Sequence, residues 1–117
     1  MKDIKGYEGL YAVTSCGRIW SYRRKMFLKP VLDGHKYLTV KLSKNGVQTR
    51  FKIHRLVAEA YIPNPLGLSD VNHKNEDKSK NYINNLEWMS HADNCNYGSR
   101  NQRISETKMG KIKNLQM

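Results

Sequence analysis

Residues 70–94 read DVNHKNEDKSKNYINNLEWMSHADN, and this stretch decides the fold of the second half of the chain. Residues 71–73 predict a short strand that runs into a loop rich in Lys, Asn and Asp. Residues 86–89 predict a second short strand, and residues 90–93 have the Ser-x-x-Asp spacing of a capping box that opens a helix. The expected order is therefore strand, loop, strand, helix.

Composition points to a protein that binds a polyanion. The chain has 117 residues, the size of one domain with arms, and 21 Lys and Arg against 10 Asp and Glu give a net charge of +11. Such a charge also suits a ribosomal or membrane-surface protein. The sequence has no run of about 18 apolar residues that could span a bilayer, and its first residues lack the apolar core of a secretory signal. A cytoplasmic protein is expected.

Charge is unevenly distributed along the chain. Residues 1–52 carry 12 basic and 3 acidic side chains, residues 53–97 carry 4 and 6, and residues 98–117 carry 5 and 1. An acidic middle segment favours a divalent cation, while basic segments on either side favour a phosphate backbone. The alternative is that each charged face is simply solvated.

The cysteines and the first apolar runs are expected to have structural roles and no catalytic role. Cys16 and Cys95 are too few for a disulfide framework and lack the spacing of a zinc site, so we expect reduced, half-buried packing residues. Residues 11–13 and 18–20 flank a turn at residues 14–17, which predicts a small hairpin.

A longer hairpin is expected over residues 36–53, around the turn signal Asn45-Gly46. Its apolar face would consist of Leu38, Val40, Leu42, Val47, Thr49, Phe51 and Ile53. Its polar face would consist of Tyr37, Thr39, Lys41, Gln48, Arg50 and Lys52. A basic, hydroxyl-bearing face suits phosphate contact or base reading by a β-ribbon, and the alternative is a basic solvent face.

Residues 54–61 have apolar side chains at helical spacing and are followed by Pro63-Asn64-Pro65, which predicts a short packing helix. His54 opens this helix, and a histidine beside an apolar stripe is more often a hydrogen-bonded structural residue than a ligand. Tyr61 and Trp88 are expected in the core.

Three segments in the same order resemble one family. GYEGLYAVTSCGRIWS at residues 6–21, HRLVAEAYIPNP at residues 54–65 and the stretch at residues 70–94 are similar to HNH homing endonucleases of the phage and intron-encoded type, with an N-terminal nuclease-associated modular domain. The resemblance implies an α+β fold, in which an N-terminal antiparallel β-sheet precedes a short helix and a ββα-metal (His-Me finger) motif. It divides the chain into a basic DNA-binding sheet module at residues 1–53, the nuclease motif at residues 54–97 and a basic C-terminal arm at residues 98–117.

The resemblance also assigns a site. His73 would be the general base, which suits an imidazole whose ordinary pKa lies near neutrality. Asn85 would tie the loop together and orient that base, and Asn72 and Asn94 would bind Mg²⁺ or Mn²⁺. Many family members carry aspartate and histidine where this chain has Asn72 and Asn94, so this ligand pair is neutral, and such a site could fill only when DNA is present.

Two other residues compete as ligands. Asp70 lies two positions before Asn72 on the same side of a strand, roughly 6.5 Å away, and His91 lies on the same helical side as Asn94. The residues expected to contact DNA share a positive charge and are Arg23, Arg24, Lys41, Arg50, Lys52, Lys74, Lys78, Lys80, Arg100 and Arg103.

The expected function is metal-dependent cleavage of double-stranded DNA by a monomer. One site on one chain cuts one strand per docking, so a nick is expected. The alternatives are a non-catalytic DNA-binding protein that retains the HNH fold and a structural RNA-binding protein of the ribosomal kind.

Overall fold

The computed structural model describes residues 1–97, and its first sheet is antiparallel with its strands in sequence order. The strands are β1 (Lys2–Asp3), β2 (Tyr11–Val13), β3 (Ile19–Ser21) and β4 (Met26–Phe27). The predicted hairpin at the N-terminus is confirmed, because β2 pairs with β3 from Tyr11 opposite Ser21 to Val13 opposite Ile19.

The second sheet consists of β5 (Val31–Leu32), β6 (Leu38–Lys44) and β7 (Val47–Lys52), again in sequence order. Asn45 and Gly46 both have positive φ, 52° and 78°, which is the conformation that a tight two-residue hairpin turn requires. The longer predicted hairpin is therefore confirmed.

Some side chains of this hairpin lie differently from the prediction. Val47 and Thr49 were expected on an apolar face but are exposed, because the end of the hairpin extends beyond the core. Thr39 was expected on the open polar face but is buried, because β5 pairs along β6 and the Thr39 hydroxyl donates to the Val31 carbonyl at 2.8 Å. The prediction of half-buried cysteines was also wrong, since Cys16 and Cys95 are both exposed.

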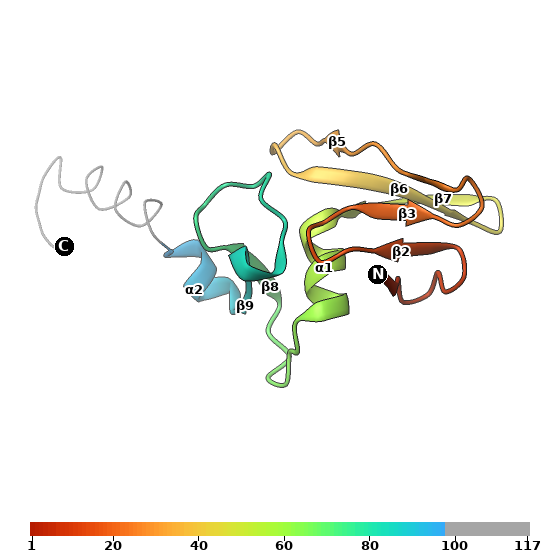
Figure 1. The fold of residues 1–117 in the computed structure, drawn as a ribbon. Helices are drawn as coiled ribbons and strands as arrows, with labels where there is room; N and C mark the ends of the chain where they lie inside the picture. Colours follow the sequence, from red (N-terminus) through yellow and green to blue (C-terminus); the bar gives the residue numbers. More distant parts are fainter. Residues whose placement is uncertain (98–117) are drawn as a thin grey trace, which may run out of the picture.

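Helix α1 (Ile53–Tyr61) follows β7 directly and lies between the two sheets and the second half of the chain (Figure 1). It begins one residue before the predicted start, because Ile53 ends the strand alternation and already packs in the core from the helix. Tyr61 and Trp88 are partly buried beside that core. The Tyr61 hydroxyl donates to the Val13 carbonyl at 2.9 Å, and the Trp88 indole donates to the Ile62 carbonyl at 2.9 Å.

The second half has the predicted ββα order. Its elements are β8 (Asp70–His73), the 3-10 helix η1 (Ile83–Asn85), β9 (Leu86–Met89) and α2 (His91–Cys95). Strands β8 and β9 are antiparallel, and the Ser90 hydroxyl caps α2 by accepting from the Asp93 amide at 3.2 Å. The α+β class and the ββα unit are thus confirmed.

Within the described part of the chain, one apolar cluster joins the two halves. Its buried members are Ile4, Val13, Ile19, Val40, Leu42, Ile53, Leu56, Val57, Ala58, Val71 and Leu86. These residues come from both sides of the predicted boundary at residue 53, so the sheets and the ββα unit pack around α1 as neighbours in one core. Within residues 1–97, no helix has the length and apolar character needed to cross a membrane.

Candidate functional site

His73 ends β8 and is only 5% exposed. Its Nε2 lies 2.6 Å from the Oδ1 of Asn81, which is also buried. Because an amide oxygen only accepts, Nε2 carries the proton of the neutral ring and Nδ1 carries the lone pair. Burial lowers the pKa of His73, and the hydrogen bond to Asn81 partly opposes that shift. His73 is therefore held in the neutral form that a general base needs at neutral pH.

Two further rings pack against His73. The ring centroids of His54 and His73 lie 4.9 Å apart, and those of Tyr37 and His54 lie 5.0 Å apart. His54 is 6% exposed, and burial lowers its pKa to about 3, with a smaller contribution from His73 once that ring is protonated at low pH. His54 is thus a neutral packing residue, placed in a ring cluster with the candidate base.

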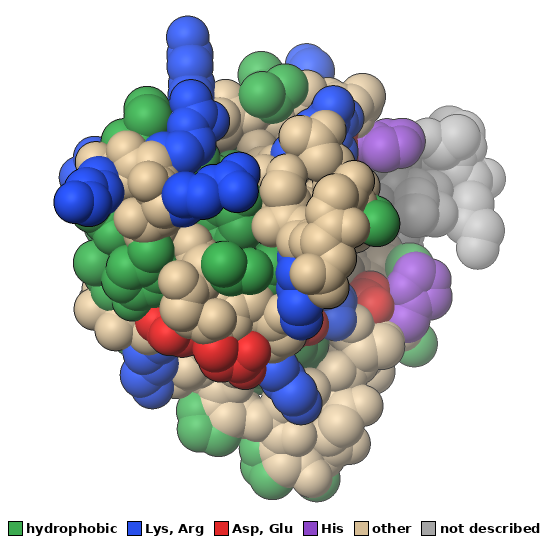
Figure 2. Space-filling view, turned by 90° about the vertical axis from the view of Figure 1, so that its right-hand side faces the viewer, with side chains coloured by type: hydrophobic (Ala, Val, Ile, Leu, Met, Phe, Trp, Pro, Cys, Tyr) green, Lys and Arg blue, Asp and Glu red, His purple; other side chains and the backbone are tan. Residues whose placement is uncertain are grey.

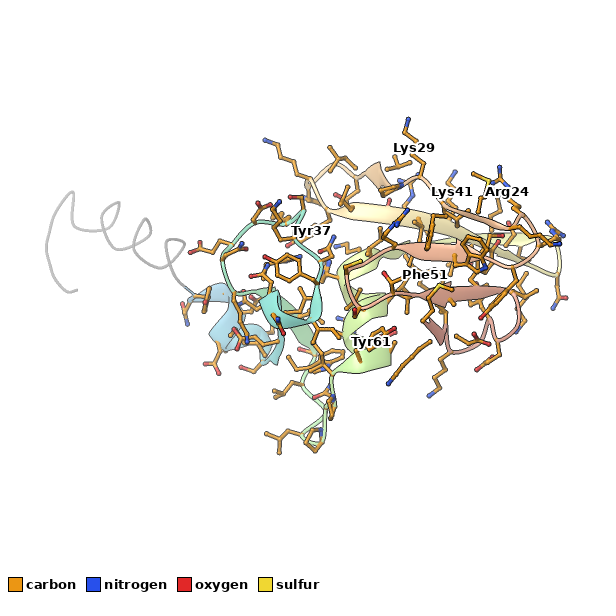
Figure 3. The ribbon with its side chains drawn as sticks, viewed as in Figure 1. Arg24, Lys29, Tyr37, Lys41, Phe51 and Tyr61 are labelled. Atoms are coloured by element: carbon orange, nitrogen blue, oxygen red, sulfur yellow. The ribbon has the colours of Figure 1, made fainter. Side chains whose placement is uncertain are left out.

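Tyr37 connects the second sheet to this cluster. Its side chain reaches from the residue before β6 toward the loop between β8 and β9 (Figure 3). The ammonium groups of Lys52 and Lys78 lie 4.6 Å and 4.4 Å from the centre of its ring, and Lys78 also donates to the His35 carbonyl at 2.9 Å. These two lysines, both expected to contact DNA, therefore pack over Tyr37 near the candidate base.

Asn85 closes the loop that follows His73. Its Nδ2 donates to the Oδ1 of Asn75 and to the Lys80 carbonyl, each at 2.9 Å. Its Oδ1 accepts from the Asn75 amide at 3.1 Å, and its carbonyl accepts from the Lys74 amide at 2.7 Å. Asn85 thus fixes both ends of the loop through its buried side chain and its backbone carbonyl.

Oxygen-bearing side chains from β8, β9 and α2 contact one another. Asn72 is buried on β8 and donates to the Glu87 carboxylate on β9 at 3.0 Å. Asp70, on the same side of β8, accepts from His91 at 2.9 Å and from Asn94 at 3.1 Å. These two hydrogen bonds, His91 first and then Asn94, lower the pKa of Asp70, so its carboxylate is ionised at neutral pH.

The chemistry of this face fits a hard divalent cation. Asn72 and Asn94 each donate through the amide nitrogen, and an asparagine binds a hard cation through its amide oxygen. The neighbouring carboxylates of Asp70 and Glu87 add oxygen donors and negative charge. Across residues 1–97 no group of three or more His, Cys, Asp or Glu side chains is arranged to hold a metal, so the amides would have to take part.

Sequence reasoning missed two partners of the predicted site. Glu87 lies opposite Asn72 in the β8–β9 ladder, and pairing the two predicted strands in antiparallel register would have found it. Asn81 lies in irregular backbone eight residues after His73, where no periodic pattern marks it.

Basic side chains also line a groove of about 410 Å³ between β4 and the second sheet. Its charged residues are Arg24, Lys29, Lys41 and Arg50, of which Lys29 was not predicted. Figure 3 shows Arg24, Lys29 and Lys41 on the side of the sheets away from α1. Figure 2, which looks at the right-hand end of Figure 1, shows several Lys and Arg side chains toward the top of that end.

The other predicted DNA contacts lie elsewhere. Arg23 lines a separate hollow at the β6–β7 turn, and Lys74 and Lys80 are exposed on the loop after His73. Arg100 and Arg103, with the predicted C-terminal arm, lie outside the described residues.

Comparison with known proteins finds two family models, each of which matches a different part of the chain. The family model of the NUMOD4 motif matches residues 2–43, and that of the HNH endonuclease matches residues 51–95. The DNA endonuclease I-HmuI of Bacillus phage SP01 is 33% identical over 116 residues, which cover 97% of this chain and 67% of the phage protein. The chain therefore belongs to the HNH homing endonuclease family.

Two further comparisons concern extent and fold. Uncharacterized HNH endonuclease L245 of Acanthamoeba polyphaga mimivirus is 44% identical over 84 residues, which are 72% of this chain and 26% of that protein. A solved structure titled "DNA binding and cleavage by the HNH homing endonuclease I-HmuI" matches with a TM-score of 0.75 and 34% identity, over 92% of this chain and 66% of that one. The chain thus spans about a quarter of the viral relative and about two thirds of the phage enzyme.

Proposed function

We propose that this chain is a metal-dependent endonuclease that nicks double-stranded DNA, acting as a monomer in the cytoplasm. The observation that carries the proposal is the state of His73. Its Nε2–H is bound to Asn81, which leaves the lone pair on Nδ1, and the ring ends the strand that also bears Asp70 and Asn72. A base and a set of hard oxygen donors on one short strand are what phosphodiester hydrolysis requires.

In the proposed reaction, a water oxygen forms a bond to phosphorus while one water proton passes to Nδ1 of His73. The bond between phosphorus and the leaving deoxyribose oxygen breaks, and that oxygen departs with the electron pair and gains a proton from solvent. Asn81 holds the ring in the correct tautomer throughout. Asn85 keeps the loop closed beside it.

Mg²⁺ or Mn²⁺ would be held by Asn72 and Asn94, with Asp70 and Glu87 supplying negative charge around them. When bound, such an ion stabilises charge on the phosphate and on the leaving oxygen. The basic groove formed by Arg24, Lys29, Lys41 and Arg50 would take the DNA backbone. Because residues 1–97 present one such site, cleavage of one strand per docking is the expected product.

Supercoiled plasmid incubated with the protein and Mg²⁺ or Mn²⁺ tests the proposal on one gel. Open circles should accumulate with metal and disappear with a chelator. His73→Ala should abolish nicking while DNA affinity stays within about threefold, because the base acts in the transition state. His35→Ala, which changes an exposed histidine in the β5–β6 loop, is the matched control and should nick normally.

The same gel tests the alternatives. Plasmid that stays supercoiled with both metals, but is retarded in a binding assay, would make the chain a non-catalytic DNA-binding protein. Competition by structured RNA that exceeds competition by duplex DNA would instead favour the RNA-binding alternative.

A further inference from the structure

The turn between β2 and β3 lies against the loop that holds His73. Gly17 in this turn has φ +86°, and a Cβ added there would lie 2.8 Å from the carbonyl oxygen of Asn81 and 3.0 Å from its Cβ. Ordinary Cβ contacts are longer than this. The absence of a side chain at Gly17 is thus what allows the turn to approach Asn81 so closely.

A second contact holds the same loop two residues further along the chain. The Ile83 amide donates to the Ser15 carbonyl at 3.0 Å. Asn81 and Ile83 are therefore both held by the turn at residues 14–17, one by close packing and the other by a backbone hydrogen bond. The loop backbone cannot shift near Asn81 without disturbing one of these contacts.

The turn itself is well braced. The Gly17 amide donates to the Thr14 carbonyl at 3.1 Å, and the Thr14 hydroxyl accepts from the Arg18 amide at 2.9 Å. Ile53 of α1 lies behind it, since its Cγ2 would be 3.3 Å from a Cβ at Gly17. A rigid turn of the first sheet thus supports irregular backbone of the nuclease unit.

We propose that Gly17 is a positioning residue for the base, acting through Asn81. The turn holds the Asn81 amide where its Oδ1 accepts from Nε2 of His73 at 2.6 Å, and this bond selects the tautomer with the lone pair on Nδ1. Catalytic groups have to be held within about 0.5 Å of their working geometry, and the loop after β8 lacks the regular backbone that would do so by itself. The N-terminal sheet is therefore part of the catalytic scaffold. This inference rests on the proposed role of His73.

The test compares Gly17→Ala with Gly6→Ala. Gly6 also has φ +86°, but a Cβ there would meet nothing within 4 Å, so the two variants share the backbone strain and differ in the contact with Asn81. We expect Gly17→Ala to lower kcat for plasmid nicking at least about tenfold with little change in KM, and Gly6→Ala to leave both near wild type.

Nitrogen NMR of the His73 ring, without DNA or metal, gives a readout independent of activity. Wild type and Gly6→Ala should show the neutral ring with its proton on Nε2, and Gly17→Ala should show a mixture of tautomers with a faster-exchanging Nε2–H. An unchanged ring and an unchanged kcat in folded Gly17→Ala would overturn the inference. Nicking by His73→Ala would instead overturn the proposed function, and the ring measurement would still report on the contact.

If Gly17→Ala does not fold, Thr14→Val decides the question. It removes the hydroxyl that accepts from Arg18, keeps the shape of the side chain and adds no atom against Asn81. A loosened turn should lower kcat several-fold with an unchanged KM and increase exchange of the Ile83 amide. Wild-type kcat together with faster exchange at Ile83 would show that the turn does not position the base.

Discussion

At the scale of single residues, two carboxylates change what a neutral pair of amides can do. Asn72 and Asn94 alone would hold Mg²⁺ weakly, but Asn72 is bound to Glu87 and Asn94 is bound to Asp70. Each amide is thereby oriented by a group whose charge attracts a cation. The sequence left open that Asp70 itself supplies a metal ligand. The structure favours testing this role, because Asp70 contacts Asn94 on α2 and shares β8 with Asn72.

Asp70→Asn tests this arrangement. Asp93→Asn is its control, because it removes the same charge from an exposed position on α2. Asp70→Asn should raise the Mg²⁺ concentration for half-maximal nicking by about tenfold, since a charge close to a divalent ion is lost. Asn72→Ala should raise it too, and Asp93→Asn should leave it within about twofold. Titration of nicking rate with Mg²⁺ and Mn²⁺ measures all three, and an unchanged titration for Asp70→Asn would limit the ligands to the amides.

His54 predicts how stability depends on pH. Its pKa is lowered to about 3 in the folded protein from an ordinary value of 6.5, so below pH 6.5 the unfolded chain binds a proton that the folded one does not. The folded state therefore loses stability as the pH falls from 6.5 toward 3. His54→Phe should lose about 2 kcal/mol less than wild type between pH 6.5 and 4.5. Urea unfolding at the two pH values measures this, and equal losses would mean that His54 titrates normally.

At the scale of elements, the strands and helices were predictable where the signal was local. Asn45-Gly46 fixed one hairpin, Pro63 ended α1, and the Ser90 cap began α2. The burial of Thr39 was not predictable, because it depends on pairing with β5. That edge strand has two residues and no alternation of its own.

The roles assigned to the site residues stay predictions, because they came from resemblance. Those residues lie on β8, in η1 and on α2, whereas Asn81 was identified only from the structure. Its role depends on a contact with Gly17, which is distant in the sequence, and no local pattern encodes such a contact.

The basic groove predicts the salt dependence of DNA binding. Lys41→Gln and Arg50→Gln should each reduce the slope of log affinity against log salt by about 0.9, because each would remove one phosphate contact. Lys5→Gln is the control, since Lys5 lines a different hollow beside α1. Unchanged slopes for both groove variants would place the DNA elsewhere on the protein.

At the scale of the whole molecule, one core predicts one unfolding transition. Leu42 is fully buried in β6 within the cluster that also contains Val71 and Leu86 of the nuclease unit. Leu42→Ala should lower the free energy of unfolding by about 2 to 5 kcal/mol, while Val47→Ala, at an exposed site, should change it by less than about 0.5 kcal/mol.

Fluorescence of Trp20 in the first sheet and Trp88 in β9 reports the two halves separately when each tryptophan is replaced in turn by Phe. Their urea midpoints should coincide in wild type and move together in Leu42→Ala. Separate midpoints would show that the sheet and the nuclease unit fold as independent domains.

The two exposed thiols have a practical consequence. Cys16 lies in the turn that contacts Asn81, and Cys95 lies on α2 with its sulfur 3.5 Å from Nε2 of His91. The native chain thus carries one exposed thiol in the turn between β2 and β3 and one on α2, on either side of the candidate site. A pair of probes attached there would report the spacing between sheet and helix during a catalytic cycle, without any engineered cysteine.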